Sequence, residues 1–161
     1  MSRSADRSPG VAPRPHVGIS IDGAPIGSLL LQVLRAHARV GTELLNAAGV
    51  TPPHEIVLLY LDGRDAVPQT ELVHYMGRDR STVTATLQAM ERAGLVVREP
   101  SASDGRALVV RLTAKGREAV PRARAAWVEL EQRTVRGLSA EQQRDLADLL
   151  VRVRDSLNSD G

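Results

Sequence analysis

The sequence predicts a mainly helical protein with one small β-hairpin. Apolar side chains recur at spacings of three and four residues through most of 26–157, the pattern of helices that bury one face. Two short runs rich in Val, 95–97 and 108–110, flank a turn-rich segment, which is the pattern of a hairpin. The elements are expected in the order α-α-α-α-β-β-α-α.

Length and composition restrict the classes of protein to consider. A chain of 161 residues is expected to form one domain with its own core. It has no cysteine, which excludes disulfides, thiolate metal sites and thiol redox switching. No apolar run approaches the roughly 20 residues of a membrane span, and no apolar segment follows Arg3 and Arg7 as in a secretory signal. We therefore expect a soluble, cytoplasmic protein with no membrane partner.

Positive charge is concentrated in residues 77–117. This segment holds eight basic and four acidic side chains, a local charge of +4, whereas the remainder holds 13 basic and 15 acidic ones. Such a concentration in a chain of net charge +2 indicates a surface that faces nucleic acid. The aromatic residues, Tyr60, Tyr75 and Trp127, are too few to form the stacking platforms that bind single strands.

The amino-terminal part is expected to contain a tail and two helices. Residues 1–23 are rich in Pro and Arg without periodicity, so we expect a disordered tail, with contact to DNA phosphates as the alternative. A helix over 26–48 carries one apolar stripe and ends at Gly49. Thr51 is the expected cap of the next, largely buried helix, which ends at the turn 62–65.

The stretch 68–94 has the layout of a helix-turn-helix. A short helix begins at Pro68, and a tight turn at Gly77 follows it. Asp79 is a natural N-cap for a longer helix over 80–93. A short helix, a glycine-containing turn and a longer helix form the arrangement that many DNA-binding proteins place on the double helix.

Beyond the hairpin the chain is expected to form two long helices. Thr113 is the expected cap of a helix over 114–136, in which Pro121 should produce a kink or split off the first turns. A capping box of Ser139 and Gln142 opens the last helix, whose apolar side chains share one face.

One face of the predicted helix 80–93 suits contact with base edges. On a helical wheel Val83, Leu87 and Met90 share the core side, and a polar strip lies opposite. Hydroxyl and amide groups hydrogen-bond to bases, a small methyl group touches thymine, and the helix N-terminus suits a phosphate. The expected contacts from this helix are Arg80, Ser81, Thr82, Thr84, Ala85 and Gln88. The alternative is the ordinary polar face of a surface helix.

The hairpin loop is the second expected contact. Asp104 and Arg106 lie two positions apart, which places them on one side of a β-arm. Asp104 would hold Arg106 extended toward the minor groove, whose narrow, electronegative form favours arginine. Arg98 and Arg111 could reach flanking phosphates. The alternative for the loop is a solvated turn pair.

A series of motifs carries a family resemblance: Asp79-Arg-Ser-Thr-Val-Thr, then Gly94-Leu-Val, then Asp104-Gly-Arg106 followed by Leu112-Thr113. These residues resemble the MarR (multiple antibiotic resistance regulator) family of bacterial winged helix-turn-helix regulators, and the resemblance extends more weakly over 26–157. It implies a winged helix-turn-helix domain over 51–112 and a helical dimerisation region formed by 24–50 and 113–158.

The resemblance also implies a function. Members of the family are homodimers that read an inverted repeat in double-stranded DNA, with half-sites about one helical turn apart. The positions that match the family's recognition-helix contacts are Ser81, Thr82, Thr84, Ala85 and Gln88. Arg106 matches its minor-groove arginine and Asp104 the partner of that arginine. We expect a dimeric, nucleoid-associated repressor that a phenolic or antibiotic-like compound releases from its operator.

The sequence indicates no sharp ligand site. Polar or aromatic residues that could line one are His37, Arg39, His54, Tyr60 and Trp127, with packing or ordinary surface as the alternative for each. A metal-responsive regulator is an alternative function, although His37 with Glu43 and His54 with Glu55 lack convincing ligand spacings. No metal site and no cofactor are expected.

Two further classes of protein fit the sequence less well. A winged-helix dimerisation or interaction module without a specific operator is one alternative, but it would lack a basic wing. An enzyme is not expected, because the sequence holds no paired-carboxylate, Ser/His/Asp, metal or phosphate-loop constellation.

Overall fold

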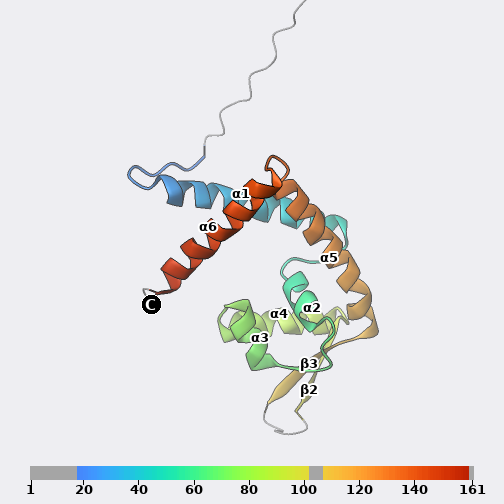
Figure 1. Cartoon of the computed structure of the whole chain (residues 1–161). Helices are drawn as coiled ribbons and strands as arrows, with labels where there is room; N and C mark the ends of the chain where they lie inside the picture. Colours follow the sequence, from blue (N-terminus) through green and yellow to red (C-terminus); the bar gives the residue numbers. More distant parts are fainter. Residues whose placement is uncertain (1–17, 102–106, 160–161) are drawn as a thin grey trace, which may run out of the picture. The chain divides into compact units, whose positions relative to one another are not determined.

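The structure, a computed structural model, describes residues 18–101 and 107–159. Its helices are α1 (Pro25–Ala47), α2 (His54–Leu61), α3 (Gln69–Met76), α4 (Arg80–Arg92), α5 (Ala114–Thr134) and α6 (Ala140–Ser159) (Figure 1). Its strands are β1 (Val67–Pro68), β2 (Val96–Pro100) and β3 (Leu108–Leu112). Helices with one small sheet confirm the predicted fold class. The chain divides into two compact units between Ala36 and His37, within α1.

The sheet contains three antiparallel strands in the order β1-β3-β2. Val67 pairs with Val110 on one side of β3, and Pro100 pairs with Leu108 on the other. Both outer strands end in proline, β1 at Pro68 and β2 at Pro100. The predicted order, which has two strands, is wrong in omitting β1. This strand is two residues long, and its proline reads in the sequence as the start of a helix.

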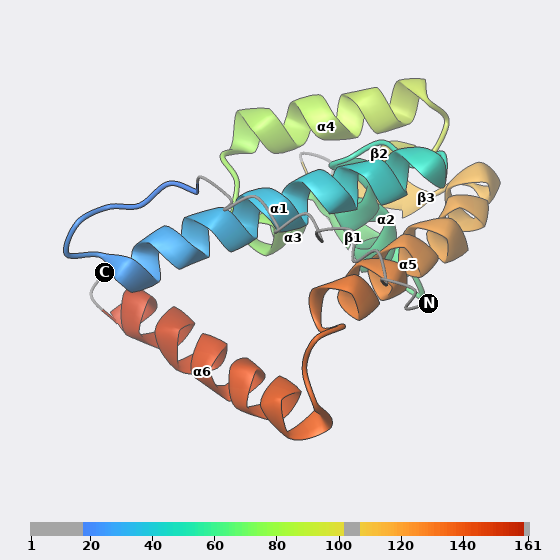
Figure 2. The ribbon, with the colours of Figure 1, turned by 90° about the horizontal axis from the view of Figure 1, so that it is seen from above.

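An aliphatic core holds the unit that begins at His37. Fully buried side chains come from α2, α3, α4 and the sheet, among them Leu58, Leu72, Leu87 and Val110. Helix α2 packs mainly on α5, and α4 packs on α3 and β2. Figure 2 shows α4 at the periphery of this group, with α2 and the sheet to one side of it. The polar side of α4 is therefore left uncovered by its neighbours within this unit.

Several helix ends follow their local sequence signals. The Thr113 hydroxyl accepts the Gly116 N–H at 3.0 Å, which confirms the predicted cap of α5. Ser139 and Gln142 form the predicted capping box, with distances of 2.8 and 3.2 Å. The prediction for Thr51 is wrong. Helix α2 starts at His54 with no side-chain cap, because the Thr51 carbonyl, not its hydroxyl, closes a turn with the His54 N–H at 2.8 Å.

Pro121 does not split α5. The helix continues from Ala114 to Thr134 through this proline, which is exposed. One missing N–H removes one hydrogen bond of a long ladder, and the packing of Ala119 and Ala123 in the core holds the turns on either side. The predicted helix therefore exists as one element.

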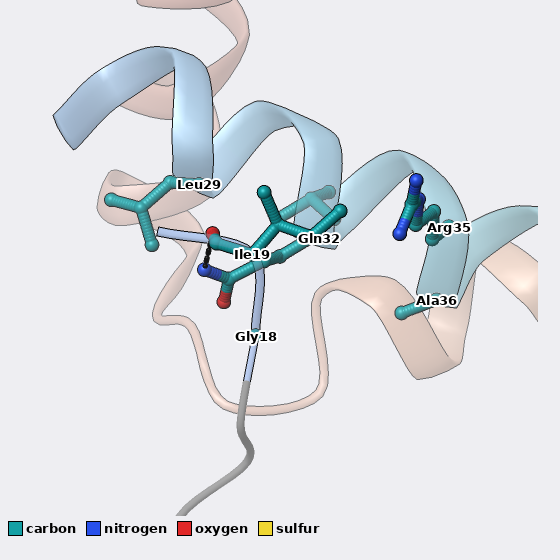
Figure 3. A pocket seen from close by; sticks show the side chains of 7 residues that line it. Gly18, Ile19, Leu29, Gln32, Arg35 and Ala36 are labelled. Carbon is teal, nitrogen blue, oxygen red and sulfur yellow. Dashed lines mark hydrogen bonds between the residues drawn. The ribbon is translucent and has the colours of Figure 1, made fainter. Parts of the chain in front are cut away.

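In the amino-terminal unit, the chain before α1 is hydrogen-bonded to that helix. The Ser28 hydroxyl accepts from the Ile21 N–H at 2.9 Å, and Gln32 Nε2 donates to the Ile19 carbonyl at 2.9 Å. Figure 3 shows the latter bond at a cavity of about 540 Å³ beside the first turns of α1. Residues 1–17 of the predicted tail lie outside the described residues.

Two helices expose apolar side chains. In α1, Leu29, Val33 and Leu34 are more than half exposed, and in α6 no residue is buried. Leu157 of α6 is 72% exposed. Within the described part of the chain, no helix is long and apolar enough to cross a membrane.

Candidate nucleic-acid interface

Asp79 fixes the start of α4. Its carboxylate accepts the Thr82 N–H at 2.9 Å and the Thr82 hydroxyl at 2.6 Å, and the Ser81 hydroxyl also donates to it. These donors lower the pKa of the Asp79 carboxyl far below its usual value, with the Ser81 hydroxyl as the largest cause. The predicted N-cap is therefore confirmed, and Asp79 remains charged at neutral pH.

The two faces of α4 differ as the helical wheel predicts. Val83, Leu87 and Met90 are fully buried, which attaches the helix to the core. The predicted contacts that are exposed are Arg80, at the first position of the helix, and Ser81, Thr82, Ala85 and Gln88. Short side chains on an exposed helix face permit a close approach to base edges.

The hydroxyl groups on this face are partly committed to intramolecular bonds. Those of Ser81 and Thr82 donate to Asp79, and that of Thr84 donates to the Arg80 carbonyl at 2.8 Å. A hydroxyl has one proton, so in this arrangement these three groups can offer a bound partner only acceptor lone pairs. Gln88 makes no hydrogen bond within the described residues, so its amide is free to donate and to accept.

Unpaired arginines surround the same face. Arg80 at the start of α4 and Arg92 at its end are exposed, and neither forms an ion pair with another described residue. Arg78, in the turn before the N-cap, is exposed in the same way. Arg78 is not among the expected DNA contacts; its position directly before a helix N-cap is the signal that could have added it to the expected phosphate contacts.

The two strand arginines have intramolecular partners. Arg98 Nη2 lies 2.7 Å from Glu91 Oε2, and its side chain is only 16% exposed. The Arg98 side chain lowers the pKa of Glu91 through these hydrogen bonds. Arg111 lies 2.7 Å from an Asp65 carboxylate oxygen and 3.4 Å from Glu99. A phosphate contact from either arginine would require it to exchange its carboxylate partner.

The hairpin of β2 and β3 is the wing of this fold, and the structure describes its two strands but not the loop between them. β2 and β3 pair up to Pro100 and Leu108, and the Ser101 N–H donates to the Ala107 carbonyl at 2.8 Å. Asp104 and Arg106 lie outside the described residues. Their role in the minor groove remains a prediction.

The five predicted ligand residues do not form one site. The rings of His37 and Trp127 lie together, with centroids 6.0 Å apart. Tyr60 instead stacks on Tyr75 at 3.9 Å and donates to Glu71. Arg39 is exposed and paired with Glu43 at 2.9 Å.

His54 lies elsewhere again. It is buried, which lowers the pKa of its imidazole, and it lines a separate cavity of about 170 Å³.

One cavity adjoins a predicted ligand residue on the α2–α5 side. It measures about 380 Å³ and is lined by Leu59, Arg124, Trp127, Val128, Glu131 and Gln132. Arg124 is tied to Asp62 at 2.7 Å. Within residues 18–101 and 107–159, no group of three or more His, Asp or Glu side chains is arranged to hold a metal ion.

Comparison with known proteins agrees with this geometry. A model of the MarR family matches residues 48–107. An HTH-type transcriptional repressor of Mycobacterium tuberculosis is 31% identical over 132 residues, which are 82% of this chain and 95% of that protein. A mutant MarR from E. coli complexed with operator DNA is 25% identical with a TM-score of 0.74, over 80% of this chain and 93% of that one. The transcriptional repressor CouR, bound to a 23-mer DNA duplex, is 29% identical with a TM-score of 0.73, over 80% and 92% of the two chains.

These relatives are transcriptional regulators and not enzymes, and their winged helix-turn-helix fold is the one described above. The predicted resemblance is confirmed by the match over nearly the whole length of the mycobacterial repressor. The chain belongs to the MarR family of winged helix-turn-helix transcriptional regulators.

Proposed function

We propose that this protein is a cytoplasmic repressor that binds an inverted-repeat operator as a homodimer. The observation that carries the proposal is the exposed face of α4, where Gln88 is unbonded and Arg78 and Arg80 have no ion-pair partner among the described residues. Protein groups that read bases and phosphates must be free to exchange water for DNA. The DNA complexes of the MarR mutant and of CouR support the same use of the fold.

A second copy of the chain is the proposed partner of the apolar faces of α1 and α6. Leu34 and Leu157 are 63% and 72% exposed, and exposed apolar faces of this kind are covered in a stable assembly. A dimer has a twofold axis, so its two copies of α4 would meet two half-sites of an inverted repeat. Sedimentation at micromolar concentration should give twice the monomer mass.

A small-molecule effector is proposed for the 380 Å³ cavity at Trp127. Its wall combines an indole ring and apolar side chains with Arg124, which is paired with Asp62, and with Glu131, a pattern that suits a compact aromatic compound with polar groups. A thermal-shift screen of phenolic and antibiotic-like compounds would identify a ligand by a raised melting temperature. Loss of the DNA complex on addition of the same compound would then establish release.

The wing prediction gives the sharpest test of DNA binding. Arg106→Ala should weaken binding to a duplex selected from a random library by about 1–3 kcal/mol, if the arginine makes a specific groove contact. Arg122→Ala removes the same charge from α5 and is the matched control. A gel-shift titration in which both variants bind like the wild type would contradict the wing assignment. A wild-type protein that enriches no duplex would favour the interaction module without an operator.

A further inference from the structure

Gln69 connects the first helix of the helix-turn-helix directly to the recognition helix α4. Its Nε2 donates to Thr84 Oγ1 at 3.0 Å, and the Thr84 hydroxyl donates to the Arg80 carbonyl at 2.8 Å. Gln69 is the first residue of α3 and follows β1 without a break. One side chain therefore links the end of a sheet strand, the start of α3 and the first turns of α4.

Thr84 is occupied by this connection. Its single hydroxyl proton goes to the backbone of its own helix, and Gln69 uses one of its two lone pairs. Thr84 is half-buried, whereas Ala85 and Gln88 on the same helix are exposed. The hydrogen bonds of Thr84 therefore attach α4 to α3.

The Gln69 carboxamide is not explained by stability. Its Oε1 is buried and accepts no hydrogen bond from any described residue. A buried oxygen without a donor is unfavourable, and an apolar side chain of similar size would avoid the cost. The amide lies at the junction of α3 and α4, where the crossing of the two helices would decide how α4 enters a groove.

We propose that Gln69 is a positioning residue for sequence discrimination, which sets the orientation of α4 through Thr84. Thr84 serves as the anchor of this bond and does not read a base. The proposal rests on the proposed DNA-binding function. It assigns to the α3–α4 junction a role in specificity that is distinct from the base-facing strip of α4.

The test is a double-mutant cycle in the full-length protein. The variants are Gln69→Leu, Thr84→Val and the pair together. Each is titrated by fluorescence anisotropy against a duplex selected by the wild type from a random library, and against a scrambled duplex of the same composition. We expect each single variant to lose about tenfold in affinity for the selected duplex, a typical coupling for contacting residues. The double variant should lose no more than one single variant, and affinity for the scrambled duplex should stay within about twofold.

The ratio of the two affinities separates positioning from stability, because partial unfolding would lower both affinities together. Thr86→Val is the matched control. Thr86 lies on the same helix and bonds the Thr82 carbonyl at 3.0 Å, also four residues back, but no bond joins it to α3 among the described residues. For Thr86→Val, the ratio of affinity for the selected duplex to affinity for the scrambled duplex should equal that of the wild type.

Two results would overturn the proposal. One is a double variant whose loss of affinity is the product of the two single losses. The other is a loss of affinity in Thr84→Val that is confined to one base pair of the selected duplex, while Gln69→Leu keeps the wild-type preference at that base pair. A wild-type protein that does not prefer the selected duplex would overturn the proposed function, and this inference with it.

Discussion

Gly116 offers a direct test of how α5 is joined to the sheet. It lies in the first turn of α5 and is buried. A Cβ atom at this position would lie 2.1 Å from the Leu95 carbonyl oxygen and 3.1 Å from a Leu112 methyl carbon. The Leu95 oxygen belongs to the backbone and already accepts the Thr113 N–H at 3.0 Å. Gly116→Ala must therefore displace α5 from the start of β2 by roughly 1 Å, since overpacking that cannot relax through a side chain moves the backbone.

The expected magnitude follows from two opposing effects. Alanine favours a helix over glycine by about 1 kcal/mol, whereas overpacking of this kind costs about 1–3 kcal/mol or more when a backbone atom is involved. Because the close contact is with a backbone atom, the cost lies at the upper end of this range, and we expect a net loss of about 2 kcal/mol in the free energy of unfolding, or about 4–8 °C in melting temperature for a chain of this length.

The assay is urea unfolding at one fixed protein concentration, because an assembly makes stability depend on concentration. Gly27→Ala is the matched control in α1. Its Cβ would meet only the Ala24 Cβ at 3.9 Å, so the same substitution should stabilise by about 0.5–1 kcal/mol. A Gly116→Ala variant as stable as the wild type would show that the α5–sheet junction yields at no cost, and the reasoning would fail.

Three further outcomes are expected. Burial raises the pKa of the Glu55 carboxyl, so its contribution to stability is fully present below its ordinary value of 4.5 and is lost as the pH rises through the raised pKa. Glu55→Gln should therefore raise the melting temperature at pH 8, and the gain should vanish in melts below about pH 4. The pKa of Asp79 is lowered, so the stability it adds is present above its ordinary value of 3.8 and lost on acidification. Asp79→Ala should lower the melting temperature at neutral pH and reduce the fall of the melting temperature on acidification. If the melting temperatures of variant and wild type fell equally with pH, the cap would be contradicted. Leu149→Glu places a charge on the exposed apolar face of α6 and should halve the mass seen by sedimentation, whereas an unchanged mass would exclude this face from the interface.

The elements that could be predicted from the sequence are those with local signals. Asp79 and Thr113 cap their helices within three residues, so their partners are visible in the sequence. The faces of α4 follow from a period that every turn repeats, and Val83 and Leu87 are buried as that period requires. Propensity and capping act over one helical turn, which is the range over which a single sequence is informative.

The features that could not be predicted depend on pairing across long stretches of chain. Strand β1 exists because Val67 meets Val110, and no pattern over two residues can reveal that. The ion pair between Arg111 and Asp65 joins residues that are far apart in the sequence, so no local pattern predicts it. The commitment of Thr84 to Gln69 is of the same kind, because fifteen residues separate the two. The exposed polar face of α4 could thus be located from the sequence, but not the hydrogen-bonding state of its individual groups.

The two prolines that end the outer strands have a consequence for how copies of the chain associate. Sheets with open edges tend to add strands from other molecules, through rows of unpaired N–H and C=O groups. At Pro68 and at Pro100 the backbone has no N–H to offer, and these two residues lie in the two outer strands of the sheet. Edge-to-edge growth is therefore disfavoured on both sides. Strand addition between copies is thus hindered at both outer strands, and the proposed dimer would have to form through other surfaces.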